Sequence, residues 1–170
     1  MPRTSAFQYP LLAVCFCLLL SGCENVFPDE YTTSRTYYFQ KDRQIVVDST
    51  QTLLHARVEP GTELVFTYQF KKDAPPNVSD GDFSETILFE IPTDGSSFEL
   101  EGSELATIPV FYDRKCYCGL IESLKVTSGY IRGEQLSDRH WMVSASLQTF
   151  SVITEETFEV SFSDVFMLTQ

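Results

Sequence analysis

The chain has 170 residues and is acidic, with 24 Asp and Glu residues against 12 Lys and Arg residues and a formal net charge of −12. This length suits one domain that can bury a core without staples. The net charge argues against nucleic acid as a partner, because phosphates require a basic footprint. It also argues against attachment to anionic lipid through the overall charge of the chain.

The first 22 residues have the composition of an export signal. Arg3 is the only early charge, the apolar run Leu11–Leu20 follows, and the small residues Ser21 and Gly22 come before Cys23. The run is about half of the roughly 20 apolar residues that a membrane-spanning helix needs. We therefore expect residues 1–22 to be removed as a signal peptide.

The sequence Leu20-Ser21-Gly22-Cys23 resembles the lipobox of bacterial lipoproteins. The resemblance implies that a diacylglyceryl group is attached to the Cys23 thiol, that the chain is then cut just before Cys23, and that the lipid carries acyl chains such as palmitate. Two or three chains suffice for stable membrane attachment, whereas one gives only marginal binding. Glu24 is not the aspartate that resembles an inner-membrane retention signal, so we expect a lipid-anchored protein of the outer membrane in a bacterial cell envelope, with the membrane face left open.

Removal of residues 1–22 would leave 148 of the 170 residues and, with Arg3 gone, a net charge of −13. Residues 23–35 are polar and lack a sustained period, which predicts a tether. From residue 36 to 170 short runs alternate with period two, which predicts a single all-β domain. The predicted strands are Thr36–Phe39, Gln44–Asp48, Thr52–Val58, Leu64–Phe70, Glu85–Ile91, Phe98–Glu101, Leu105–Tyr112, Leu124–Gly133, Trp141–Gln148, Phe158–Phe162 and Val165–Thr169.

Turn residues separate these runs at Glu59–Thr62, Pro92–Gly95 and Leu136–Arg139. Many short strands with regular turns predict an antiparallel β-sandwich of roughly 8–10 strands. The alternative is a lipocalin-like β-barrel that carries a small apolar ligand. The stretch Gly61–Gln148 also resembles uncharacterised all-β lipoproteins of Gram-negative envelopes, through the segments PGTELVF, CYC and GYIRG with a later W; that resemblance assigns no activity.

Cys116 and Cys118 are the sharpest local feature. Residues i and i+2 of a strand point to the same face, so both thiols could meet one metal ion or one partner. Thiolates suit Cu(I) or Zn, with His140 as a further ligand, but a structural zinc site needs four protein ligands. The interpretations are a disulfide or simple packing, a metal site and a redox site.

The long connection Lys72–Ser84 carries a second candidate site. Asp80, Asp82 and Glu85 offer hard oxygens that suit calcium. Their spacing does not match the EF-hand pattern, which favours a solvated acidic turn. Long connections in small domains are often functional.

No motif of a hydrolase or metalloprotease is present, and we expect no enzyme and no cofactor. The sequence favours a non-catalytic binding or structural module, attached to the membrane by Cys23. Recognition of a protein or glycan would use strand faces, exposed aromatics such as those of Tyr37–Phe39, or the Lys72–Ser84 connection. A metal- or redox-handling protein that uses Cys116 and Cys118 is one alternative, and a carrier of a small apolar ligand is the other.

Overall fold

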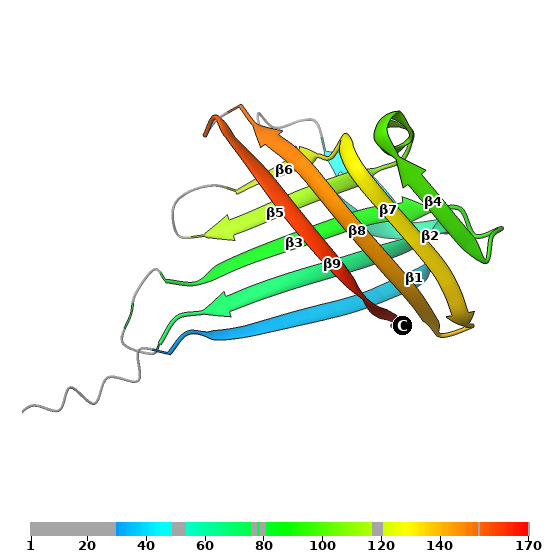
Figure 1. Ribbon diagram of the computed structural model, residues 1–170, viewed down its shortest axis with the longest axis horizontal. Coiled ribbons are helices and arrows are strands. Elements are labelled where there is room, and N and C mark those ends of the chain that lie inside the picture. Colours follow the sequence, from blue (N-terminus) through cyan, green and yellow to red (C-terminus); the bar gives the residue numbers. More distant parts are fainter. Residues whose placement is uncertain are drawn as a thin grey trace, which may run out of the picture.

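A computed structural model describes residues 30–48, 54–75, 78, 81–116, 121–152 and 154–169. This part of the chain is built almost entirely of strands (Figure 1). In chain order the elements are β1 (Thr32–Asp48), β2 (His55–Asp73), β3 (Phe83–Ile91), β4 (Ser97–Glu101), the 3-10 helix η1 (Gly102–Thr107), β5 (Val110–Cys116), β6 (Ile121–Lys125), β7 (Ser128–Ser137), β8 (His140–Ser151) and β9 (Glu156–Leu168).

The nine strands form one continuous sheet in the order β4-β7-β8-β9-β1-β2-β3-β5-β6. The sheet bends at β9 and β1, so that β7, β8 and β9 cross over β1, β2 and β3 as a second layer (Figure 1). The predicted all-β sandwich is thereby confirmed. The sheet keeps two edge strands, β4 and β6, so the lipocalin-like barrel is wrong.

The bend contains the one neighbouring pair in this sheet that is not antiparallel. β1 and β9 run parallel and meet only where Tyr38 pairs with Met167 and Phe39 pairs with Leu168. The Thr169 amide adds a 2.9 Å hydrogen bond to the Phe39 carbonyl. The sheet is therefore mixed, which corrects the prediction of a wholly antiparallel sandwich.

The core between the layers is aromatic. Phe39, Phe66 and Phe89 are direct neighbours in register on β1, β2 and β3. Phe66 stacks on Phe39 at 5.3 Å and on Phe89 at 4.9 Å, between ring centroids. From the other layer, Trp141 and Phe166 make T-shaped contacts with Phe66, each at 5.7 Å between ring centroids. These side chains alternate with outward-facing ones, so each layer has one apolar inner face. The two inner faces pack against each other, which explains the period-two pattern of the sequence.

The predicted alternation of β8 is confirmed. Trp141, Val143, Ala145 and Leu147 are buried, whereas Met142 is 40% exposed. The space between the layers beside Tyr112 has no room for a water molecule. Within the described part of the chain, this interior is filled rather than hollow.

Three predicted strand pairs are in fact the single long strands β1, β2 and β9. The predicted turn Glu59–Thr62 lies inside β2, opposite a β-bulge in β1 where Arg43 pairs with both Pro60 and Glu63. Asp42 adopts the left-handed conformation at this bulge, with φ of 55°. A Cβ at Gly61 would lie 2.6 Å from the Gln44 Cβ, so only glycine lets the two strands approach this closely. The turn residues therefore bend both strands instead of ending them.

Beyond the bulge, the end of the β1–β2 hairpin packs on the outer face of the β2–β3–β5 layer. Ile45 joins Val65, Leu88 and Phe111 in a second buried cluster. The Ile45 amide donates to Glu90 Oε2 at 2.6 Å, and the Ala56 amide donates to Ser123 Oγ at 3.1 Å.

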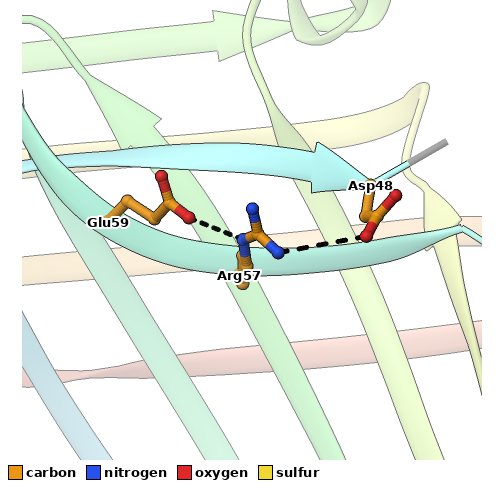
Figure 2. A network of polar contacts seen from close by, with 3 residues as sticks. All are labelled: Asp48, Arg57 and Glu59. Carbon is orange, nitrogen blue, oxygen red and sulfur yellow. Dashed lines mark hydrogen bonds and ion pairs between the residues drawn. The ribbon is translucent and has the colours of Figure 1, made fainter. Parts of the chain in front are cut away.

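On the exposed side of this hairpin, Arg57 lies between two carboxylates (Figure 2). Its Nε is 2.7 Å from Glu59 Oε1, and its Nη1 is 3.9 Å from Asp48 Oδ2.

Three further boundaries differ from the sequence prediction. The start of the predicted strand Leu105–Tyr112 is the helix η1, which buries Leu105, and β5 begins only at Val110, after Pro109. The predicted strand Leu124–Gly133 is divided between β6 and β7. β1 begins at Thr32, inside the predicted tether, because Thr32 already pairs with Asp73. Among the residues that the structure describes, no helix has the length and apolar character needed to cross a membrane.

Replacing Phe66 by alanine should lower the free energy of unfolding by ~3–5 kcal/mol, because it removes the ring on which both layers pack. Urea denaturation followed by fluorescence measures this loss. Phe150→Ala is the matched control, because that ring is 55% exposed; its effect should stay within ~0.5 kcal/mol. Similar losses in the two variants would show that the stack is not the centre of the core.

Candidate functional site

The β2–β3 connection and Cys116, which the sequence identified as two separate candidate sites, lie together at one end of the sheet. The register aligns Lys72 of β2, Phe83 of β3 and Cys116 of β5 side by side. This is the end at the left of Figure 1, where β1 also begins. It holds a hollow of about 340 Å³, here named the loop-end hollow, which is lined by Lys71, Asp73, Asp82, Phe83, Ser84, Lys115 and Cys116.

The β2–β3 connection is tied to itself by local bonds. The Ala74 amide donates to Asp82 Oδ1 at 2.9 Å, and the Val78 amide donates to the Pro75 carbonyl at 2.9 Å. Lys72 Nζ lies 4.1 Å from the centroid of the Tyr31 ring, a cation–π contact to the residue before β1. These bonds hold the rim of the loop-end hollow in place.

The candidate calcium ligands are not brought together. Asp82 accepts the Ala74 amide, whereas Glu85 Oε1 accepts the Tyr112 hydroxyl at 2.7 Å on the inner face of the sheet. Asp80 lies outside the described residues. No group of three His, Cys, Asp or Glu side chains arranged for a metal ion occurs in the part of the chain that the structure describes.

Cys116 is disulfide-bonded. Cys118 and the other cysteines lie outside the described residues. A metal ligand must be a thiolate, so a bonded Cys116 favours the disulfide interpretation over the metal interpretation. His140 opens β8 at the far end of the molecule, where its Nδ1 lies 2.9 Å from Ser137 Oγ, and so it is not beside Cys116 (Figure 1).

The aromatic residues of Tyr37–Phe39 belong mainly to the core. Phe39 is fully buried, and Tyr37 is half-buried with its ring 5.4 Å from that of Tyr68 and 5.5 Å from that of Phe166. Tyr38 is half-buried on the other face of β1. These three rings therefore stabilise the fold more than they offer a recognition platform.

Two arginines that the sequence reasoning missed lie near this end of the sheet. Arg114 packs over the rings of Phe83 and Phe158, at 5.0 and 4.9 Å from their centroids, and Arg35 packs over Phe70 at 5.0 Å. Arg114 also lies 3.9 Å from Glu156 Oε2. The sequence alternation could have identified both arginines. Arg35 falls on the same strand face as the inward-facing Tyr37 and Phe39, and Arg114 falls on the same face as Tyr112. A charged residue at such a position indicates the open end of a core.

The side chains of Ser123, His55 and Asp113 come together on the outer face, but not as a catalytic triad. Ser123 is hydrogen-bonded to the Asp113 carboxylate and accepts the Ala56 amide. A triad needs the histidine between the other two, and no described hydrogen bond joins Ser123 to His55. Burial raises the pKa of Asp113, while the Ser123 hydrogen bond and the nearby Lys115 and His55 act to lower it.

The raised pKa of Asp113 predicts a pH dependence of stability. The folded state binds this proton more tightly than the unfolded state, where the pKa is about 3.9. The contribution of protonated Asp113 to the free energy of unfolding is therefore fully present below about pH 4. It is lost as the pH rises through the pKa that Asp113 has in the folded state. The variant Asp113→Asn should lose less stability than the wild type between pH 4 and pH 7, measured by urea denaturation at each pH.

Asp94→Asn, which changes an exposed turn carboxylate, is the control and should keep the wild-type slope. A wild-type slope in Asp113→Asn would contradict the prediction.

Compared with known proteins, the chain matches no family model, no curated protein and no solved structure. Its function is therefore inferred from its own residues and their geometry.

Proposed function

We propose that this chain is a lipid-anchored protein of the bacterial envelope that acts as a non-catalytic binding module. The observation that carries the binding role is the loop-end hollow, where the β2–β3 connection and Cys116 meet. The sequence alone does not show that these two features lie together, because more than 30 residues separate Asp82 from Cys116. The anchor is Cys23, and the outer membrane is the proposed location.

The position of β1 supports a link between anchor and hollow. Thr32, the first residue of β1, pairs with Asp73, which lines the hollow. Thr32 follows Cys23 by nine residues, and nine residues extend at most ~30 Å. A lipid on Cys23 would therefore keep the loop-end hollow close to the membrane.

The chemistry of the lining supports a polar partner. Lys71 and Lys115 supply cations, Asp73 and Asp82 supply carboxylates, and Phe83 supplies an aromatic ring. Such a mixture fits a protein or glycan surface with hydrogen-bonding groups of both kinds. The acidic chain does not fit nucleic acid.

A redox role is the second candidate, because the disulfide-bonded Cys116 lines the same hollow. A thiol of a partner that enters the hollow could exchange with this disulfide: its thiolate attacks one sulfur and releases the other as a thiolate. The carrier role lacks comparable support, because the described interior beside Tyr112 is filled.

The anchor is tested by Cys23→Ala in a bacterial host. The full chain should sediment with the membrane fraction, and the variant should not, because it cannot be acylated. Cys116→Ser is the control: it removes a different cysteine and should leave the chain with the membranes. If Cys23→Ala still sediments with membranes after a high-salt wash, the proposed anchor is wrong.

A further inference from the structure

A second hollow lies at the other end of the straight part of β1 and is rich in cations. It has a volume of about 440 Å³ and is lined by Gln40, Lys41, Arg43, Arg139, Leu168 and Thr169. We name it the basic hollow. It is formed by the bulge of β1, the β7–β8 turn and the end of β9, at the lower right of Figure 1.

Backbone bonds hold these three segments together. The Leu168 amide donates to the Arg139 carbonyl at 3.0 Å, and the Thr169 amide donates to the Phe39 carbonyl at 2.9 Å. Lys41 and Arg43, on either side of the bulge residue Asp42, both line the hollow. The three cations therefore come from a fixed framework and not from a free loop.

The cations of the basic hollow are not neutralised within the described residues. Arg57, Arg114 and Arg132 each have a carboxylate within 4.0 Å. Across the residues with described side chains, no carboxylate forms such a pair with Lys41, Arg43 or Arg139.

This is unexpected in a chain with twice as many acidic as basic residues. The adjacent Glu63 instead accepts the Thr62 hydroxyl at 2.9 Å. Arg43 is half-buried, so its charge is partly shielded from water. Three cations that line one hollow and form no ion pair with a described carboxylate favour an external anion.

We propose that the basic hollow binds a phosphate group carried by a ligand outside this chain. Two guanidinium groups can each bind phosphate oxygens in a bidentate manner, and Lys41 adds a point charge. The phosphate belongs either to a soluble ester or to a lipid headgroup, which share this chemistry. The inference is independent of the loop-end hollow and of the anchor.

The test is isothermal titration of the purified protein with inorganic phosphate at low salt, where screening is weak. Arg43→Gln and Arg139→Gln should each weaken binding about tenfold, the effect of losing a hydrogen bond to a charged group. Arg57→Gln is the matched control, because its charge is already paired with Asp48 and Glu59 (Figure 2). It should change the affinity less than about twofold.

A second arm distinguishes the source of the phosphate. Vesicles of phosphatidylcholine with phosphatidylglycerol are sedimented with the same proteins. Vesicle binding that Arg139→Gln abolishes supports a lipid headgroup, and saturable binding of inorganic phosphate supports a soluble ester. Thermal melts of each variant identify any that fail to fold, and the exposed Lys41→Gln then replaces Arg43→Gln. If the wild type binds neither probe, or if Arg57→Gln weakens binding as much as Arg139→Gln, the proposal is overturned.

Discussion

Three phenylalanine rings, one from each of three neighbouring strands, stack at the centre of the sandwich, and aromatic rings of the second layer pack against them in T-shaped contacts. Phe66 is the middle ring and has no exposed surface. The layers are one sheet, joined at β1 and β9 by only two pairs of residues. So short a junction fixes the bend but contributes few hydrogen bonds, and burial of the rings between the layers must supply most of the stabilisation.

The bend also determines where sites can form. At the left of Figure 1, β1, β2 and β3 extend beyond β9, so charged side chains can reach solvent beside aromatic rings at that end. Arg35 and Arg114 lie over such rings there. At the basic hollow, the bulge of β1 redirects this strand close to the point where the end of β9 contacts it. The loop-end hollow thus follows from the register of β2, β3 and β5, and the basic hollow follows from the meeting of β1 with the end of β9 and the β7–β8 turn.

The sequence predicted the fold class because alternation depends only on which face of a strand is buried. The sequence prediction of a turn failed at Glu59–Thr62, which lie within β2 opposite the bulge of β1, since a reversal depends on the partner strand and not on the local residues alone. The loop and Cys116 were identified as local motifs, whereas their meeting depends on the β2–β3–β5 register. The basic hollow was missed for the same reason: Arg43 and Arg139 lie almost 100 residues apart.

The loop-end hollow is tested most directly by photo-cross-linking in living bacterial cells. A photoreactive residue at Lys115, which lines the hollow, should give one discrete cross-linked product. The same residue at Lys125, which is also exposed and lies on β6 with its Nζ donating to the Ala106 carbonyl at 3.3 Å, should give none. The same product from both positions, or no product from Lys115, would contradict recognition at this end of the sheet.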